Sequence, residues 1–228
     1  MDRTRLDFNI QAIRRYTTEH AELRQAHHFL YDLPLNLDVG PPELVVMGIN
    51  PGETQVDRDS CAGPTEETSK YDFHEHSPAG RSKGSKRWRE LTVKFTGGRS
   101  VVFTELFFWS SKSHAELLER FECLWHSRHL GFCIDMNKEL IQAYQPMAVI
   151  FVGLSNSEKA ASAFGLKYIN THSVGGTRVI EHYRDAHRPW FFTKHWTGSR
   201  GFTTPQRDAI RIYLEQNLIG EKCKAKSS

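Results

Sequence analysis

The sequence predicts an α/β protein, a three-layer α/β/α sandwich around a central, mostly parallel sheet of four strands. Two observations lead to this fold class. Short apolar runs rich in β-branched residues, as in buried parallel strands, alternate along the chain with segments of helical periodicity. The 228 residues show no internal repeat and suffice for one sizeable core.

Four apolar runs are the predicted strands, and helical segments follow them. The strands are expected at residues 43–49, 100–109, 146–154 and 189–195. The helices are expected at residues 85–95, 113–144, 155–165 and 203–218. Gly165 and Pro205 are typical of a helix end and a helix start. Residues 177–183 are interpreted as an edge strand or a loop.

The chain is expected to divide into three parts. Residues 1–35 carry apolar positions among charges and are interpreted as an N-terminal helical extension packed on the core. Residues 36–219 form the α/β domain, and residues 220–228 form a disordered tail. Within the domain, residues 51–85 are rich in Gly, Pro, Ser, Thr and charge, which predicts a long loop of a functional or mobile kind.

The composition is that of a soluble globular protein, with 39% hydrophobic and 25% charged residues. No apolar run approaches the roughly 20 residues of a membrane span. The N-terminal segment is charged from its start and lacks the apolar centre of a signal peptide. We therefore expect a cytoplasmic protein with no membrane partner. The net charge of +3 is too mild to indicate a nucleic-acid partner by itself.

The cysteines do not indicate a metal centre or a disulfide framework. They are Cys61, Cys123, Cys133 and Cys223, and none forms a CxxC pair. No metal site is therefore predicted.

A cluster of basic residues begins just before the helix expected at residues 85–95. Five of them surround Trp88 within nine residues: Arg81, Lys83, Lys86, Arg87 and Arg89. The cluster is either the solvated start of a helix or a patch that contacts phosphates.

Polar residues stand at the ends of three predicted strands. Asn50 follows the first strand, the second strand reaches Thr104 and Glu105 amid aromatic residues, and the fourth ends in Lys194 and His195. In open α/β sheets ligands bind outside the carboxyl ends of the strands, so these side chains converge on one crevice if the strands are neighbours. Each has a simpler interpretation. Asn50 can serve a turn, Glu105 can face solvent at an edge, and His195 is one of twelve histidines and can be a surface residue.

The motif GINPG at residues 48–52 resembles the first motif of the uracil-DNA glycosylase superfamily, most closely its mismatch-specific thymine/uracil branch. SPAGR (77–81) and the segment 146–165 are similar to segments of the thermophilic branch and its relatives. FTELFFW (103–109) lies where those proteins carry a strand that ends in a base-reading asparagine. KHWTGSRGF (194–202) lies where their second motif, His-Pro-Ser, is expected. The order and spacing agree over roughly residues 40–215.

The resemblance implies a monofunctional DNA glycosylase of base excision repair. It would act as a monomer and without a cofactor on single- or double-stranded DNA, and hydrolyse the N-glycosidic bond of a flipped uracil or another deaminated or damaged base.

The resemblance also implies roles for individual residues. Asn50 would position the attacking water, and His195 would donate a hydrogen bond to the leaving base. Gly48, Ile49, Pro51 and Gly52 would face the base or a phosphate, and Tyr71 or Phe73 would either stack on the base or anchor the loop. Seven residues would contact DNA: Arg81, Lys83, Lys86, Arg87, Thr197, Ser199 and Arg200.

Two positions depart from the family pattern. Glu105 stands where the family reads uracil with asparagine, and an ionised carboxylate only accepts hydrogen bonds. Three alternatives follow for Glu105. The ionised carboxylate would suit a base edge with two hydrogen-bond donors. Burial would instead keep the carboxyl protonated and similar to an amide, or the side chain points away from the base. Trp196 and Thr197 replace the usual Pro and Ser.

Two other functions stay open. One is a nucleic-acid-binding protein of the same fold that holds a base without cutting it. The other is an unrelated α/β enzyme, although the sequence lacks GxGxxG and GxxxxGK[ST].

Overall fold

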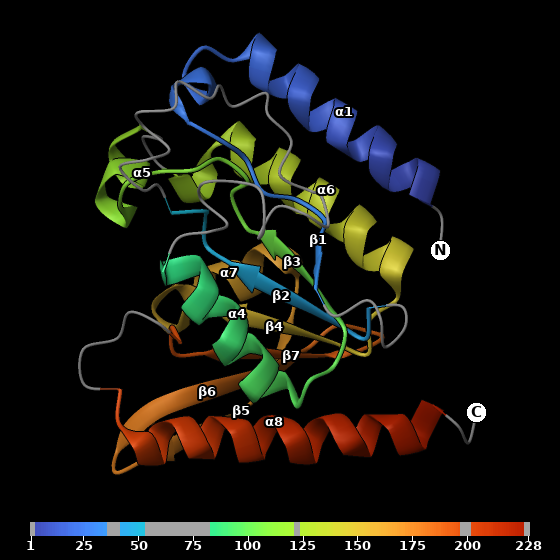
Figure 1. Cartoon of the computed structure of the whole chain (residues 1–228), viewed down its shortest axis with the longest axis vertical. Coiled ribbons are helices and arrows are strands. Elements are labelled where there is room, and N and C mark those ends of the chain that lie inside the picture. The colour runs from blue at the N-terminus through green and yellow to red at the C-terminus, as the bar shows by residue number, and fades with distance from the viewer. Residues whose placement is uncertain (1–2, 36–41, 53–82, 121–123, 197–201, 226–228) are drawn as a thin grey trace. The chain divides into compact units, whose positions relative to one another are not determined.

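A computed structural model describes residues 3–35, 42–52, 83–120, 124–196 and 202–225. It is an α/β structure with a mixed sheet of seven strands in the order β1-β3-β2-β4-β7-β6-β5 (Figure 1). The strands are β1 Leu33–Leu35, β2 Leu44–Gly48, β3 Val101–Glu105, β4 Ala148–Val152, β5 Lys167–Val174, β6 Thr177–Arg184 and β7 Pro189–Thr193. The α/β class is confirmed.

The described helices lie at the predicted positions with two differences: the segment 113–144 contains two separate helices, and the C-terminal helix continues beyond residue 218 to Ala225, into the predicted disordered tail. They are α1 Arg3–Glu19, α4 Lys83–Thr96, α5 His114–Arg120, α6 Arg128–Tyr144, α7 Ser157–Phe164 and α8 Thr204–Ala225. Short 3-10 turns lie at Leu23–Gln25, Leu124–His126 and Leu154–Asn156. The helix α7 ends at Gly165, whose φ of 71° is the left-handed conformation that favours glycine. No helix in the described part of the chain is long and apolar enough to cross a membrane.

The prediction of a four-stranded sheet is wrong, because the sheet also includes β1, β5 and β6. The strands β2, β4 and β7 run parallel to one another, whereas β6 pairs antiparallel with β7 and with β5. Residues 177–183 therefore belong to an interior strand. The sequence did not predict β5, because its first five residues are exposed and its sequence therefore has no buried apolar pattern.

The chain divides into two compact units. The first contains residues 1–35, 48–86 and 102–145, and the second contains residues 36–47, 87–101 and 146–228. The helices α1, α5 and α6 belong to the first unit. The strands β4 to β7 and the helices α7 and α8 belong to the second.

In the first unit, α1 lies alongside α6 (Figure 1). The buried residues Leu6, Ile10 and Ile13 recur at helical spacing and form the apolar face of α1. The end of α1 is fixed by the indole N–H of Trp109, which donates to Thr17 Oγ1 at 2.8 Å.

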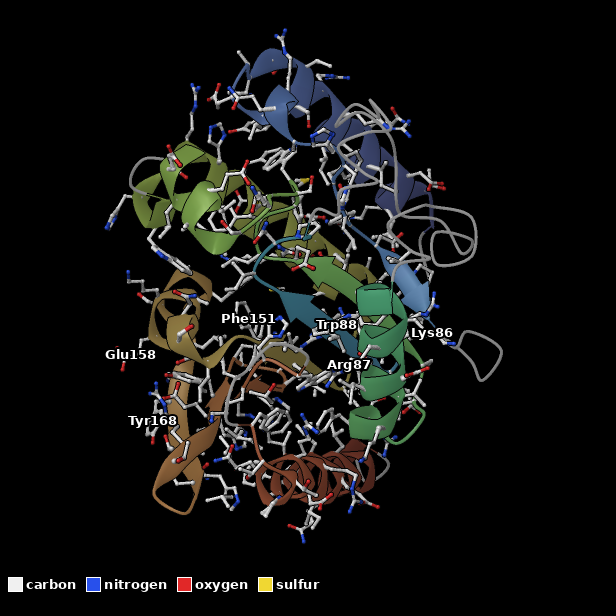
Figure 2. All side chains as sticks on the ribbon, turned by 60° about the vertical axis from the view of Figure 1, so that its left-hand side comes forward. Lys86, Arg87, Trp88, Phe151, Glu158 and Tyr168 are labelled. Atoms are coloured by element: carbon white, nitrogen blue, oxygen red, sulfur yellow. The ribbon has the colours of Figure 1, made fainter. Side chains whose placement is uncertain are left out.

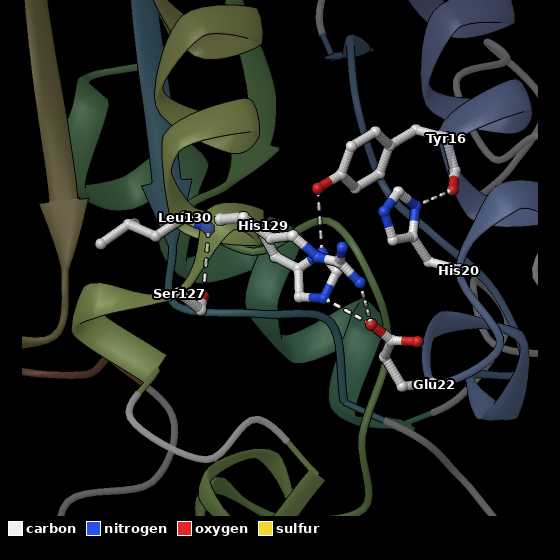
Figure 3. Close-up of polar contacts among 7 residues, drawn as sticks. Tyr16, His20, Glu22, Ser127, His129 and Leu130 are labelled. Atoms are coloured by element: carbon white, nitrogen blue, oxygen red, sulfur yellow. Dashed lines mark hydrogen bonds and ion pairs between the residues drawn. The ribbon is translucent and has the colours of Figure 1, made fainter.

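A polar cluster of Tyr16, His20, Glu22 and His129 also joins α1 to α6 (Figure 3). His129 Nε2 lies 2.9 Å from Glu22 Oε1, and His129 Nδ1 lies 3.0 Å from the Tyr16 hydroxyl. Because the carboxylate only accepts, the neutral imidazole carries its hydrogen on Nε2, and the Tyr16 hydroxyl donates to Nδ1. Tyr16 is stacked between His20 and Phe132, with ring centroids 4.1 and 3.8 Å away.

In the second unit, the five residues of β4 and the five residues of β7 are all buried. Their aromatic side chains pack on one another, as in the pair Phe151 and Phe192, whose ring centroids are 4.8 Å apart. The helix α8 contacts β5 and β6. Tyr213 of this helix donates to Asn170 Oδ1 at 2.9 Å, so the exposed strand β5 is held from one face.

Candidate functional site

The GINPG motif follows β2 and is held by backbone hydrogen bonds to the segment after β3. Leu106 N–H donates to Gly48 O at 2.9 Å, and Phe107 N–H donates to Ile49 O at 2.8 Å. Ser111 N–H donates to Pro51 O at 3.1 Å, and Gly52 forms an isolated parallel bridge with Ser111. The motif therefore continues the strand pairing beyond the end of β2, which fixes its backbone.

The side-chain amide of Asn50 has one defined orientation. Its Nδ2 donates to Pro51 O at 3.0 Å and to Ser111 Oγ at 2.8 Å. Ser111 Oγ in turn donates to Ser113 O at 3.0 Å, so it must accept from Asn50. Both amide hydrogens are thus used. Among the described residues no hydrogen bond reaches Asn50 Oδ1, which keeps its acceptor capacity.

These contacts allow both interpretations of Asn50. The bond to Pro51 O is the turn role that such a residue can have. The bond to Ser111 leaves Asn50 Oδ1 as a fixed acceptor at the end of a strand. An acceptor held in this way can orient a water molecule without acting as a strong base.

Glu105 is the last residue of β3, and its carboxyl group lies against Gly48. A Cβ atom built on Gly48 would stand 2.9 Å from the carboxyl carbon of Glu105, so a side chain at position 48 would force this carboxyl to shift. Glycine at position 48 is therefore what permits this position of the Glu105 carboxyl. The two residues form one structural pair although 57 positions separate them in the sequence.

One oxygen of the Glu105 carboxyl is enclosed without a hydrogen-bond partner among the described residues. The side chain as a whole is half-buried, but Oε2 is buried and has no hydrogen-bond partner among the described residues. Burial raises the pKa of this carboxyl from 4.5 to about 8, so that it is mostly protonated at neutral pH. The interpretation of Glu105 as a solvent-facing edge residue is wrong, since β3 lies between β1 and β2.

Asn137 fixes the end of β3 from the neighbouring helix α6. Its Oδ1 accepts from Thr104 Oγ1 at 2.8 Å, and its Nδ2 donates to Glu105 O at 2.9 Å. The sequence reasoning missed both Asn137 and Ser111. A signal for Asn137 exists, because it occupies a buried position of α6 between Ile134 and Leu140, where an unpaired amide would be costly.

His195 lies in the second unit, two residues after the end of β7. It is exposed, and its ring centroid lies 5.6 Å from that of Trp88 in α4. Burial of part of the ring lowers the pKa of His195, which favours the neutral imidazole at pH 7. A neutral imidazole can donate one N–H to a developing negative charge.

Trp196, the residue after His195, is fully buried. Its indole N–H donates to Thr193 Oγ1 at 3.0 Å. Its ring is stacked on Trp88 and Phe95, with centroid distances of 5.3 and 4.9 Å. Packing and a hydrogen bond thus hold Trp196 in place.

The basic residues at the start of α4 are only partly described. Lys86 and Arg87 are exposed, and Trp88 beside them is half-buried (Figure 2). Lys83 lies in the first turn of α4, but its side chain is outside the described part. The remaining predicted site residues lie outside the described residues: Tyr71, Phe73, Arg81, Thr197, Ser199 and Arg200.

The structure thus brings together two groups of predicted residues. Asn50, Glu105 and the GINPG backbone form one group in the first unit, and His195 lies with Trp88 in the second. Among the described residues, no group of three His, Cys, Asp or Glu side chains could hold a metal ion. No protein-family model matches this chain, and no curated protein matches it either.

Proposed function

We propose that this protein is a monofunctional DNA glycosylase that removes a flipped uracil or another deaminated or damaged base. The proposal includes the three-layer, uracil-DNA glycosylase-like arrangement and a monomeric protein that binds DNA. The observation that carries it is the Asn50 amide, whose two hydrogens are used by Pro51 and Ser111 so that Oδ1 stays available for a water.

The reaction breaks the bond between C1′ of the sugar and the base nitrogen. As this bond lengthens, positive charge grows on the sugar and negative charge on the base, as in other glycoside cleavages. Water held by Asn50 Oδ1 attacks C1′ and afterwards loses its proton to solvent. A weak acceptor suffices, because the cationic sugar is a strong electrophile.

The departing base needs a hydrogen-bond donor for its developing negative charge. The neutral imidazole of His195 supplies one N–H without carrying a charge of its own. In its neutral form Glu105 supplies an O–H donor and a C=O acceptor, the same pair as an asparagine amide. That pair matches a base edge with a carbonyl beside an N–H, such as O4 and N3–H of uracil.

Phosphate contacts would come from the exposed start of α4. Lys86 and Arg87 lie there, and their contacts would give salt-dependent affinity with little sequence preference.

The test is single-turnover cleavage of labelled oligonucleotides followed by alkali. The substrates carry uracil, hypoxanthine, xanthine or thymine opposite guanine, in single and double strands. Asn50→Ala should lower the cleavage rate by roughly 10²–10³-fold, the range found when one positioned polar group is removed. Asn156→Ala is the matched control, because the Asn156 side chain makes no capping bond to α7. An equal rate in Asn50→Ala would contradict the proposal.

A second candidate is a nucleic-acid-binding protein of the same fold that does not cut. The replacement of the base-reading asparagine by Glu105 and of the usual Pro by Trp196 favours it. It predicts tight DNA binding with no alkali-labile product on any substrate. Binding and cleavage measured on the same oligonucleotides separate the two functions.

A further inference from the structure

Trp88 is the half-buried aromatic residue in the basic first half of α4, and it lies against His195 and Trp196, the second and third residues after β7. Its ring centroid is 5.6 Å from that of His195, with a 37° angle between the rings. It is 5.3 Å from that of Trp196, with an angle of 29°. All three residues belong to the second unit.

The backbone next to His195 is fixed independently of Trp88. Trp196 is fully buried, its N–H is bonded to Thr193, and its second face is covered by Phe95. The position of the His195 backbone is therefore set by β7 and Trp196. The orientation of the His195 ring depends on the groups that contact this ring, and Trp88 is one of them.

We propose that Trp88 positions the His195 imidazole and couples it to the phosphate-binding face of α4. This inference rests on the function proposed above. Arg87 is exposed and adjacent to Trp88 in the same helix, so a phosphate held by Arg87 fixes the helix that carries the aromatic support of His195. A tryptophan suits this role because its ring is large and rigid and has only two side-chain torsions.

The chemical consequence concerns the protonation of His195. The indole ring lies beside the imidazole and shields part of it from water, and burial lowers the pKa of His195. The imidazole donor is then neutral at pH 7 and held in one orientation. Loss of the indole would expose more of the imidazole, raise its pKa toward 6.5 and free its orientation.

The first experiment is an NMR titration of the histidine rings in the full chain. The His195 signal is identified by its loss in His195→Gln. Trp88→Leu, which keeps an apolar side chain but no ring, should move the pKa of His195 upward, and Trp88→Phe should restore most of the wild-type value. Trp125→Ala, which removes a partly exposed tryptophan of the first unit, is the control and should leave this pKa unchanged. An unchanged titration in folded Trp88→Leu would overturn the inference.

The second experiment separates binding from chemistry on uracil-containing DNA. Trp88→Leu should lower kcat about tenfold with little change in KM, as expected for a displaced catalytic group. Arg87→Ala should raise KM with kcat unchanged. A change confined to KM in Trp88→Leu would overturn the positioning role. If the wild-type protein cleaves no base, the proposed function fails, and the titration still decides whether Trp88 positions His195.

Discussion

Replacing Glu105 with glutamine should remove a pH-dependent loss of stability from the folded protein. Burial raises the pKa of the Glu105 carboxyl from 4.5 to about 8 in the folded state, and no such burial acts on the unfolded chain. Between these two values the folded protein holds a proton that the unfolded chain has released. The free energy of unfolding must therefore fall as the pH rises.

The size of this effect follows from the two pKa values. Each tenfold change in proton affinity corresponds to about 1.4 kcal/mol, so the full contribution is at most about 5 kcal/mol. The side chain is half-buried rather than wholly enclosed, which reduces the expected loss to roughly 2–3 kcal/mol. The contribution is complete below pH 4.5 and is lost as the pH rises through about 8. Glutamine has nearly the same shape and stays neutral over this range.

Urea unfolding at intervals from pH 5 to pH 9 measures the prediction. At each pH the free energy of unfolding of Glu105→Gln is subtracted from that of the wild-type protein. In the resulting difference curve the contributions of the other titrating groups cancel. We expect this difference to change by roughly 2–3 kcal/mol over that range, in favour of the glutamine variant at high pH. Glu158→Gln, at an exposed position of α7, is the matched control for the substitution itself. A flat difference for Glu105→Gln would refute the argument that this carboxyl is buried and neutral.

Two further changes test the packing around the site, and a third tests the polar cluster between α1 and α6. Gly48→Ala should lower the free energy of unfolding by about 1–3 kcal/mol in urea titrations, because the new Cβ would meet the Glu105 carboxyl, and part of this loss should disappear in the background Glu105→Ala. Asn137→Ala should cost about 2–4 kcal/mol by the same measurement, since it leaves buried polar groups without partners, and a loss below 1 kcal/mol would contradict this. Glu22→Gln should weaken the dependence of the free energy of unfolding on acid pH. The pKa of Glu22 is lowered from 4.5 to about 2, first by the hydrogen bond from its own backbone and then by those from Arg128 and His129. This contribution is complete above pH 4.5 and is lost as the pH falls toward 2, so acid titrations of wild-type protein and variant should diverge there.

The central strands were predictable from the sequence because a strand that is buried on both faces consists of a continuous run of apolar residues. The strands β2, β4 and β7 are almost wholly buried, and each appears as a continuous apolar run. The strand β5 is held by pairing with β6 and by a contact from Tyr213, while most of its side chains remain exposed. Its position depends on backbone hydrogen bonds, which do not select a residue pattern.

The candidate site was predictable where a local motif marks it and hidden where distant residues complete it. Asn50 stands out in the sequence because a polar residue follows an apolar run and precedes Pro51 and Gly52. Its orientation depends on Ser111, 61 positions away, and nothing in the local sequence around that serine indicates the contact. The same holds for Gly48, whose need for glycine comes from Glu105 rather than from its own backbone turn.

The protonation of Glu105 leads to a last prediction, which concerns activity rather than stability. An asparagine amide offers a donor and an acceptor at every pH, but a carboxyl offers both only while it is protonated. If Glu105 reads a carbonyl and an adjacent N–H of the base, single-turnover cleavage of uracil-containing DNA should fall as the pH rises through about 8. Glu105→Gln should keep its rate above that pH, because the amide cannot lose the donor. Equal pH profiles for the two proteins would mean that the buried carboxyl has a structural role beside Gly48 and that another group reads the base.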